Sequence, residues 1–358
     1  MYEHLVWGSA RWVMVLAVVA GFGGTLEAQQ GLNPYRPVAW GELPEGRELG
    51  PTGAVYPDVD GRHIWVADRC GPTDSPFNTG ESCLDKKISP ILLFSPEGKL
   101  VRSFGEGLFL RPHGLHVDWE GNVWVADAPS GGLSDEGSRR GIGHQVIKFS
   151  PEGEVLMTLG EAGGADEPGY FFQPNDIVVA PSGDIFIAEG HETQRGPARI
   201  VKFDSKGELL MAWGSFGSGQ GEFVTPHALA MDSQGRLFVA DRGNNRIQVF
   251  DQEGEFLAVW TQFGSPSGLY IDADDVIYVA DASSGPTSNP GWEQGIRIGD
   301  ARTGWVTAFI PAQQPPGEPG GAEGVAADAE GNVYGAETRT ATDVRRSQPL
   351  QKYVRIRP

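Results

Sequence analysis

The sequence predicts an all-β fold, a six-bladed β-propeller built from four-stranded blades. Glycine and proline are abundant, 51 and 26 residues of 358, which favours many tight turns over long helices. No segment keeps a 3.6-residue hydrophobic period over three helical turns. One template recurs. It begins with a turn and a short apolar strand, which is usually followed by Asp and a turn that contains glycine. A second apolar strand then ends in Ala and an acidic residue. Its six copies span residues 51–69, 112–128, 174–190, 226–242, 266–282 and 322–338.

Further strands follow most copies of the template. Alternating segments such as "HQVIKFS", "ARIVKFD" and "NRIQVFD" come next, and four copies continue through an "EG" or "KG" turn into a strand such as "ELLMAWG". A repeat of about 40 to 55 residues with four short strands is typical of a propeller blade. The sixth copy lacks a fourth strand after "LQKYVRIRP". We expect "YRPVAWGELPEG", from the N-terminal part, to supply it and close the ring, which covers the open edges.

The first 28 residues are predicted to form a signal peptide, and residues 29–358 a single propeller domain. Arg11 precedes the eleven-residue apolar run "WVMVLAVVAGF", and small and polar residues follow up to Ala28. These are features of a secretory signal, and the run is short for a membrane-spanning helix. The alternative is an uncleaved N-terminal anchor. In either case we expect an extracytoplasmic chain, secreted or periplasmic, without stable membrane insertion once the signal is cleaved.

The net charge limits the expected binding partners, and the cysteine content indicates a disulfide. A formal net charge of −19 and a pI near 4.7 argue against nucleic acid and anionic membrane surfaces. Cys70 and Cys83 are the two cysteines, and in an oxidising compartment we expect them to form one disulfide. The alternatives are a metal pair or a nucleophilic thiol, for which neither cysteine has a supporting partner nearby. We expect the protein to be a monomer.

An acidic residue closes the second strand in all six copies. Because a residue that every blade needs for folding should recur in every blade, we interpret these acids as structural. We expect their carboxylates to accept N–H groups of the following loop; the alternative is a ring of metal ligands. The six are Asp68, Asp127, Glu189, Asp241, Asp281 and Glu337.

The slot that begins each inner strand varies from blade to blade. It holds, in chain order, Thr52, His113, Asn175, His227, Ser267 and Glu323. Blades lie about 60° apart around the axis, so His113, His227 and Glu323 fall on alternating blades and converge on the channel. Two imidazoles and a carboxylate suit Zn²⁺ or a similar divalent ion, with positions left for water or substrate. The alternative is that the histidines fill the channel and bind ordered water.

A second variable slot follows the acidic residue of each copy. Arg69 and Arg242 occupy it where the other four blades carry small or short residues. An arginine at the rim of a metal-bearing channel would bind a carboxylate in a bidentate way; the alternative for each is a surface salt bridge. The loops after this slot are long in blades one, two and five, and we expect them to shape a pocket over one face.

The template resembles NHL repeats, and the propeller resembles the peptidyl-α-hydroxyglycine α-amidating lyase family. The likeness covers nearly all of residues 50–354 and is most specific in "FLRPHGLHVDWEGNVWVADA", "FFQPNDIVVAPSGDIFIAEG" and "GEFVTPHALAMDSQGRLFVADRGNNRIQVF". The family implies a six-bladed propeller with a catalytic zinc on axial histidines and a structural calcium. It also implies arginines that bind the substrate and a tyrosine that assists the chemistry. Its reaction cleaves a carbinolamide C–N bond and gives a peptide amide and glyoxylate.

By this resemblance, His113 and His227 match two zinc histidines, and Arg242 and Arg69 match substrate-binding arginines. The carbonyl of Leu115 matches a calcium ligand. Three positions depart from the family. Glu323 stands in place of the third zinc histidine, and Gly324 in place of the calcium-binding aspartate. His191, in "EGHETQRG", lies nearest to the position of the catalytic tyrosine. The calcium is therefore in doubt. We expect His191 to move a proton in place of the tyrosine.

Three functions remain open. The first is a metal-dependent lyase of the amidating type, acting on a small or peptide-derived substrate that bears a carboxylate. His191, Arg69 and Arg242 would be its catalytic residues. The second is a metal-dependent hydrolase such as a lactonase, because six-bladed propellers host those as well. The third is a non-catalytic extracytoplasmic NHL propeller that binds a protein or another ligand on one face.

Overall fold

A computed structural model gives the structure of this chain. It describes residues 32–71, 82–167, 169–191, 196–313, 320–338 and 349–356. Residues 31–358 form one compact unit. The predicted signal peptide, residues 1–28, lies outside the described residues.

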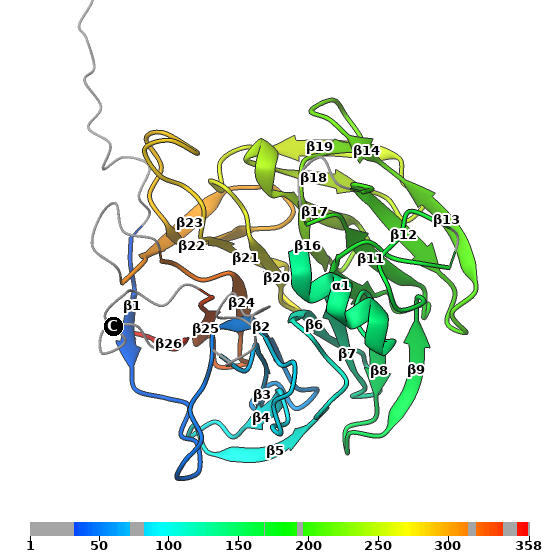
Figure 1. The fold of residues 1–358 in the computed structure, drawn as a ribbon. Coiled ribbons are helices and arrows are strands. Elements are labelled where there is room, and N and C mark those ends of the chain that lie inside the picture. Colours follow the sequence, from blue (N-terminus) through cyan, green and yellow to red (C-terminus); the bar gives the residue numbers. More distant parts are fainter. Residues whose placement is uncertain are drawn as a thin grey trace, which may run out of the picture. The chain divides into compact units, whose positions relative to one another are not determined.

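Six four-stranded antiparallel sheets surround a central axis, as predicted (Figure 1). Blade one consists of β2 (Thr52–Pro57), β3 (Ile64–Asp68), β4 (Ile91–Phe94) and β5 (Leu100–Phe104). Blade two consists of β6 (Pro112–Val117), β7 (Val123–Asp127), β8 (Val146–Phe149) and β9 (Val155–Leu159). Blade three consists of β10 (Pro174–Val179), β11 (Ile185–Glu189), β12 (Arg199–Phe203) and β13 (Leu209–Trp213).

The second half of the ring repeats this plan. Blade four consists of β16 (Pro226–Met231), β17 (Leu237–Asp241), β18 (Arg246–Phe250) and β19 (Phe256–Trp260). Blade five consists of β20 (Gly268–Ile271), β21 (Val276–Asp281), β22 (Gly295–Asp300) and β23 (Val306–Pro311). Blade six consists of β24 (Gly324–Ala327), β25 (Val333–Ala336), β26 (Leu350–Arg355) and β1 (Tyr35–Val38). A short parallel pair, β14 (Ser215–Phe216) and β15 (Glu222–Phe223), connects blades three and four.

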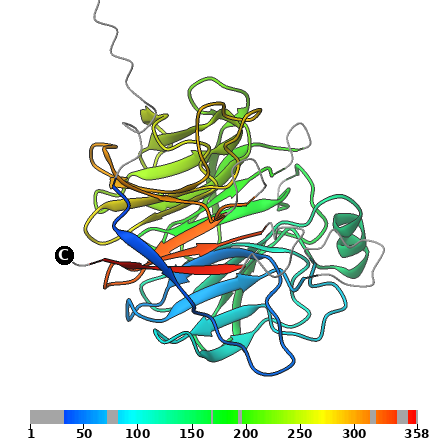
Figure 2. The same cartoon turned by 90° about the vertical axis from the view of Figure 1, so that its left-hand side faces the viewer.

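The N-terminal strand closes the ring, as the sequence predicted. β1 pairs antiparallel with β26, with Tyr35 opposite Arg355 and Val38 opposite Lys352. Figure 2 shows β1 lying beside β26 at the outer side of blade six. The pairing fills the edge of β26 that would otherwise present unpaired backbone groups. Two distant parts of the chain therefore share one sheet and lock the circle.

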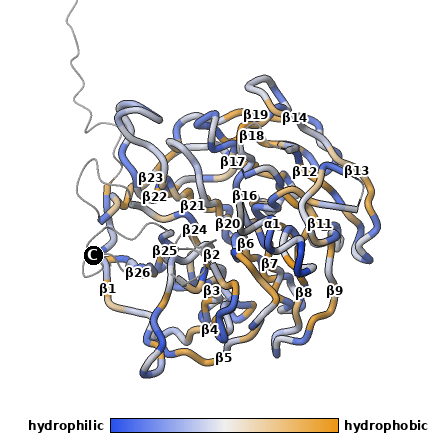
Figure 3. Tube along the Cα trace, viewed as in Figure 1, coloured by the Kyte–Doolittle hydropathy of each residue, from blue (hydrophilic) through white to orange (hydrophobic). Residues whose placement is uncertain are grey.

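The hydrophobic core lies between neighbouring blades. Trp65 and Phe104 of blade one, for example, pack in one cluster with Phe149 of blade two. The ring centroids are 5.4 Å apart between Trp65 and Phe104 and 5.0 Å apart between Phe104 and Phe149. Hydrophobic stretches follow the strands, whereas hydrophilic residues concentrate in the connecting turns (Figure 3). Burying one such ring is worth about 2 to 3 kcal/mol, so the interfaces between blades hold the inner strands in fixed positions.

A helix, α1 (Gly131–Arg140), occupies the long loop of blade two, where the sequence indicated no helix. Its segment, "GGLSDEGSRR", has three glycines and no apolar stripe. Glu136 pairs with Arg139 and Arg140 one turn later, and Gly141 ends the helix with a φ of 70°. Tertiary contacts and local ion pairs therefore support α1, which lies on the opposite side of the propeller from the C-terminus (Figure 2). None of the described helices is long and apolar enough to cross a membrane.

The predicted disulfide is present between Cys70 and Cys83, whose Cα atoms lie 5.0 Å apart. It joins the end of blade one's second strand to the segment before β4. Most of the long loop that it encloses, residues 72–81, lies outside the described residues. The bond ties Cys70, which directly follows Arg69, to Cys83.

The acids that close the second strands are structural, but most of their partners differ from those expected. Asp127 accepts the N–H groups of Leu110 and Arg111, at 2.9 and 2.6 Å, and Asp241 accepts that of Val224 at 2.7 Å. These donors precede the inner strand instead of following the second strand. The reason is the antiparallel register, because Asp127 lies opposite Pro112, the first residue of β6. Donors from the following loop occur at Asp68 and Asp281.

Candidate metal centre

The inner strands begin together at one end of the channel, and this places the variable slot around the axis. His113 and His227 are the second residues of β6 and β16, and Glu323 directly precedes β24. All three side chains are buried and line the same small cavity, whose volume is about 40 Å³. Since one water molecule needs roughly 10 to 15 Å³, this space suits an ion with one or two small ligands.

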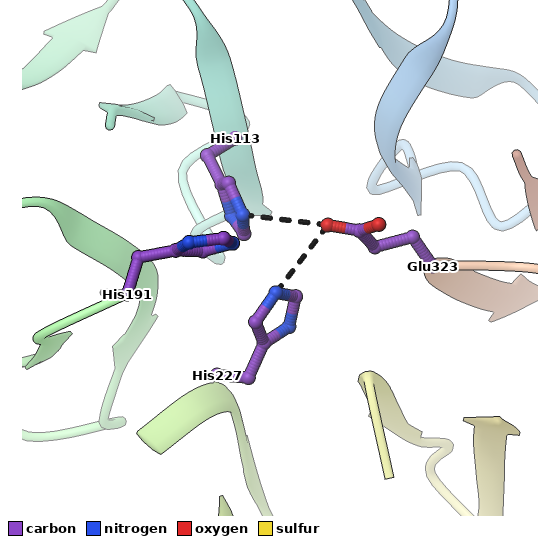
Figure 4. Close-up of side chains that lie close together, drawn as sticks. All are labelled: His113, His191, His227 and Glu323. Carbon is purple, nitrogen blue, oxygen red and sulfur yellow. Dashed lines mark ion pairs between the residues drawn. The ribbon is translucent and has the colours of Figure 1, made fainter. Parts of the chain in front are cut away.

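The structure brings the three predicted ligands into contact distance of one another. Glu323 Oε1 lies 3.5 Å from His113 Nε2 and 3.3 Å from His227 Nε2. Figure 4 shows the two imidazoles and the carboxylate pointing at one point from three directions. The predicted three-fold arrangement of blades two, four and six is therefore observed, and the role of these side chains as ligands remains a prediction.

A third histidine joins this group. His191 follows β11 in blade three, and its ring centroid lies 5.0 Å from that of His113 and 5.3 Å from that of His227. One ligand atom from each of the three histidines and from Glu323 falls within 4.8 Å of the others. The sequence placed His191 near the site only through the family resemblance, because it lies outside the variable slot.

The two slot histidines are held in one tautomer by main-chain carbonyls. His113 Nδ1 lies 2.8 Å from the carbonyl oxygen of Asn175, and His227 Nδ1 lies 2.6 Å from that of Ser267. A carbonyl can only accept, so each Nδ1 carries the proton and each Nε2 carries a lone pair. Both Nε2 atoms are buried and make no hydrogen bond among the described residues. This is the arrangement of imidazoles that hold a metal ion, with the second nitrogen fixed by a hydrogen bond.

The electrostatics keep the donors in their metal-binding forms. Burial lowers the pKa of His227 to about 4, with Arg242 adding to the effect, and burial lowers the pKa of His113 well below its usual value. Burial alone would raise the pKa of Glu323, but Arg69 and the two imidazoles hold it well below its usual range. The imidazoles are therefore neutral and the carboxylate is ionised at neutral pH, as ligation requires.

Glu323 is fixed by two neighbours. Arg69 Nη2 donates to its Oε1 at 3.2 Å, and Thr338 Oγ1 donates to its Oε2 at 2.6 Å. Arg69 also donates through Nε to the carbonyl of Pro112 at 3.1 Å, and its side chain is fully buried. The alternative that Arg69 makes a surface salt bridge is therefore wrong. Its predicted contact with a substrate carboxylate is not tested by this geometry.

Arg242 lies on the other side of the site and is partly exposed. It begins a short 3₁₀ turn, η2 (Arg242–Asn244), and its Nη2 lies 3.4 Å from His191 Nε2. Because a guanidinium only donates, His191 Nε2 accepts in this contact. Burial and then Arg242 lower the pKa of His191 well below its usual value. The two catalytic residues predicted near this mouth are thus neighbours, while their roles stay predictions.

The part of the channel beyond the metal centre contains the positions that correspond, by the family resemblance, to the calcium site. Leu115 lines it two residues after His113, and the role of its carbonyl stays a prediction. A Cβ on Gly324 would lie 2.8 Å from Ala54 Cα and 2.9 Å from the carbonyl oxygen of Gly53. An aspartate at this position would therefore force the neighbouring strand to move. This steric conflict argues against the calcium site that the family resemblance implies.

A carboxylate that the sequence reasoning missed enters this part of the channel from blade three. Asp176 lines the cavity, its Oδ2 accepts the N–H of Leu229 at 2.9 Å, and burial raises its pKa to about 7. The signal was available, because the position after the variable slot holds glycine or alanine in the other five blades. Those residues are Gly53, Gly114, Ala228, Gly268 and Gly324.

Fold and repeat together define the class of protein, a six-bladed NHL propeller. The NHL repeat family model matches residues 223–250, which include His227 and strands β16, β17 and β18 of blade four. The chain is 37% identical over 209 residues to the probable peptidyl-alpha-hydroxyglycine alpha-amidating lyase of Caenorhabditis elegans, which covers 55% of this chain and 54% of that protein. It is 34% identical over 212 residues to the peptidyl-glycine alpha-amidating monooxygenase B of Xenopus laevis, covering 55% and 21%. The chain thus spans about half, or less, of the length of these relatives.

A relative whose name states no reaction matches at a similar level. NHL repeat-containing protein 3 of Homo sapiens is 35% identical over 161 residues, or 43% of each chain. Among solved structures, a gluconolactonase from Xanthomonas campestris aligns with a TM-score of 0.55 and 12% identity over 91% of both chains. A streptogramin B lyase aligns with a TM-score of 0.52 and 11% identity, covering 89% of this chain and 97% of that one. At these identities the structures show a shared fold. The chain is thus related in sequence to amidating lyases over about half of its length.

Proposed function

We propose that this protein is a metal-dependent lyase that cleaves the C–N bond of a carbinolamide. The observation that carries the proposal is the group of three histidines and Glu323, of which His113, His227 and Glu323 are buried. In this group two Nε2 lone pairs face one carboxylate oxygen without a hydrogen bond of their own. Leaving two such atoms unpaired in a folded interior costs about 1 to 3 kcal/mol each. A cation between them removes this cost. The similarity to proteins named as amidating lyases supports the reaction class.

The donor set fits Zn²⁺ better than a hard cation. Imidazole nitrogens with one carboxylate are ligands of zinc and related transition metals, whereas Ca²⁺ and Mg²⁺ prefer oxygen. His113, His227 and Glu323 would hold the ion. When bound, it would supply Lewis acidity toward the substrate hydroxyl or a water molecule.

The remaining residues bind the substrate and move a proton. We assign Arg242, which is partly exposed, to the substrate carboxylate, because a guanidinium matches a carboxylate in shape and charge. Its neighbour His191 is neutral at neutral pH, so it can accept the proton of the substrate hydroxyl. We assign Arg69 to the orientation of Glu323, since it is buried against that carboxylate.

The reaction needs no further reactant. The hydroxyl group loses its proton to His191 while its oxygen forms a C=O bond to the same carbon. The C–N bond breaks, its electron pair leaves with the amide nitrogen, and a proton returns to that nitrogen. The products are a primary amide and glyoxylate. Arg242 would hold the carboxylate that becomes part of glyoxylate.

Export and a monomeric state belong to the same proposal. The disulfide between Cys70 and Cys83 is the form that cysteines take in an oxidising compartment, which supports an extracytoplasmic protein. A substrate that is small or is the end of a peptide suits a narrow channel mouth. A non-catalytic propeller is the competing function, since NHL repeat-containing protein 3 is as similar in sequence. The gluconolactonase shares only the fold, so a lactonase has no further support.

Two measurements test the proposal. Metal analysis of the purified full-length chain should find about one zinc or similar ion per chain, and chelation should abolish activity. Glyoxylate release from α-hydroxyhippurate should then be seen in the metal-loaded protein. A chain that binds no divalent metal would refute both enzyme functions. A metal-loaded chain that releases no glyoxylate would refute the lyase.

A further inference from the structure

A second cavity opens at the end of the channel opposite the metal centre. Its volume is about 180 Å³, and its wall is formed by the last residues of five inner strands. His116, three positions after His113, lies at this end, as do Tyr56, Met231 and Tyr270. Pro181 is exposed at the rim, so the cavity is open to solvent. It lies apart from the residues assigned to the lyase reaction.

Three aromatic side chains form a continuous wall of this cavity. The rings of Tyr56 and His116 are 4.8 Å apart at 66°, and those of Tyr56 and Tyr270 are 5.4 Å apart at 88°. His116 is 6% exposed, yet its ring nitrogens make no hydrogen bond to any described residue. The hydroxyls of Tyr56 and Tyr270 likewise make none within the described part of the chain. Three polar groups therefore face one space without a hydrogen bond to a described residue, and they can bond to a molecule bound there.

The charged groups that interact electrostatically with these three aromatic side chains are carboxylates. Asp176 acts on Tyr56, Asp118 on His116, and Asp272 and Asp328 on Tyr270. Asp118 is already paired with Lys148. In contrast, Asp272 and Asp328 accept only N–H and O–H groups of uncharged donors in the described structure, including the hydroxyls of two tyrosines of β21 and β25. Asp232, which lines the cavity, is paired with Arg236, and Lys352 interacts electrostatically with Asp328. Asp272 is therefore the carboxylate that brings negative charge to this mouth.

We propose that this cavity binds an alkylammonium group, either of a small amine or of a lysine side chain of a peptide. An ammonium over the aromatic rings gains cation–π attraction, and the nearby carboxylates add to it. Its hydrocarbon part would pack on the apolar residues Val178, Leu229 and Met231. An anion would face the carboxylates, and a neutral apolar ligand would leave the imidazole and the hydroxyls unpaired. The volume of about 180 Å³ is below that of pockets for drug-sized ligands, which suits a small cation.

Calorimetric titration of the metal-loaded, full-length protein tests this site. The probes are choline, Nα-acetyl-lysine methylamide and 3,3-dimethylbutan-1-ol, which has the shape of choline without its charge. We expect at least one of the two cations to bind about tenfold more tightly than the neutral alcohol. The choline and lysine titrations separate the two sources of the ammonium group. If neither cation binds more tightly than the alcohol, or if neither binds up to about 50 mM, the proposal is overturned.

Variants locate the binding. Tyr270→Leu should weaken cation binding about tenfold, whereas Tyr270→Phe, which keeps the ring, should stay within about threefold of the unmodified protein. Tyr170→Leu, at the outer groove between blades two and three, is the matched control and should change nothing. If Tyr270→Leu does not fold, Asp272→Asn takes its place and should weaken the cations several-fold without affecting the alcohol. Unchanged cation affinity in the folded variant places the binding elsewhere and refutes the site. Zinc content is measured in parallel and should be the same in all variants.

Discussion

The two ends of the inner strands differ in how their polar groups are satisfied. Where the strands end, five blades carry an aspartate in the turn, namely Asp58, Asp118, Asp232, Asp272 and Asp328. Asp118, for example, accepts the N–H groups of Glu120 and Asn122 and the indole N–H of Trp124, at 2.9 to 3.0 Å. Where the strands begin, the residue changes from blade to blade, and His113 and His227 each keep an unpaired buried nitrogen.

This difference separates folding from function within one repeat. A residue that each blade needs recurs around the ring and has its hydrogen bonds filled by its own blade, as the aspartates do. A residue that serves the site occurs on alternating blades and leaves bonding capacity directed at the axis. The comparison explains why the turn aspartates and the axial histidines should respond in opposite ways to substitution.

The largest expected effect is at the beginning of the inner strands. The double variant His113→Ala/His227→Ala removes both imidazole lone pairs, so we expect loss of bound metal and a fall in glyoxylate release of about 1,000-fold or more. The fold should persist, because main-chain pairing holds β6 and β16 in their sheets, and each substitution removes one hydrogen bond to the next blade. Metal analysis and a lyase assay check the prediction. His63→Ala, which removes a histidine from the turn between β2 and β3 of blade one, is the control. Full metal content in the double variant would contradict the assignment of His113 and His227 as metal ligands.

The opposite outcome, a loss of stability with metal retained, is expected where the inner strands end in the aspartate turns. Asp118→Ala leaves two turn N–H groups and the Trp124 indole without an acceptor, and we expect it to lower the free energy of unfolding by about 3 kcal/mol. Metal content should not change. Urea denaturation with metal analysis measures both quantities. Glu120→Ala, in the same turn but exposed, should cost about 0.5 kcal/mol or less. A variant that loses metal without losing stability would erase the distinction between the two ends.

His144 sharpens the comparison because both of its ring nitrogens are paired. Its Nε2 lies 2.6 Å from Ser134 Oγ, and its Nδ1 accepts the N–H of Gln173 at 2.9 Å. Burial lowers the pKa of His144 from 6.5 to about 4. The folded state then binds fewer protons than the unfolded state between these values, so the stability from neutral His144 is present above pH 6.5 and is lost as the pH falls to about 4.

The unmodified protein should therefore lose about 2 kcal/mol more stability than His144→Asn when the pH is lowered from about 7 to about 5. Asparagine tolerates the positive φ of 59° at this position. Urea denaturation of both proteins at the two pH values gives the difference, and metal content should be equal in both. An identical pH dependence would show that His144 does not titrate with folding.

The smallest effect is expected at the rim of the channel. Arg242→Lys keeps the charge but loses the planar pair of donors, so we expect KM to rise about tenfold with a smaller change in kcat. Steady-state kinetics of glyoxylate release measures both constants. Metal should be retained, and Arg302→Lys, in an exposed turn of blade five, should behave like the unmodified protein. A change confined to kcat would instead indicate that Arg242 acts through His191.

Most of the fold could be predicted because the sequence repeats itself. Six copies of one strand and turn pattern predicted six blades, and the missing fourth strand of the last copy predicted the pairing of β1 with β26. Helix α1 could not be predicted from its own residues, since it has no apolar stripe. It depends on contacts such as Gly137 against Leu110, where a Cβ would lie 2.1 Å from the leucine side chain.

The candidate site was predictable where the copies could be compared with each other. His113, His227 and Glu323 stood out in a slot that the other blades fill with Thr, Asn and Ser. His191 and the burial of Arg69 did not, because one lies in a loop without a repeat pattern and the other depends on a contact 254 residues away in sequence. Asp176 was visible in the adjacent slot, where the other blades have glycine or alanine.

The sequence by itself determined the number of blades, the closing strand, the disulfide and the positions that vary around the axis, because each follows from local patterns that can be compared along the chain. Only the tertiary structure decided which atoms face the axis. The carbonyls of Asn175 and Ser267, each in the same slot of the next blade, fix the tautomers of His113 and His227. A main-chain carbonyl is present at every residue and carries no sequence signal, so its direction becomes known only when the blades are packed side by side.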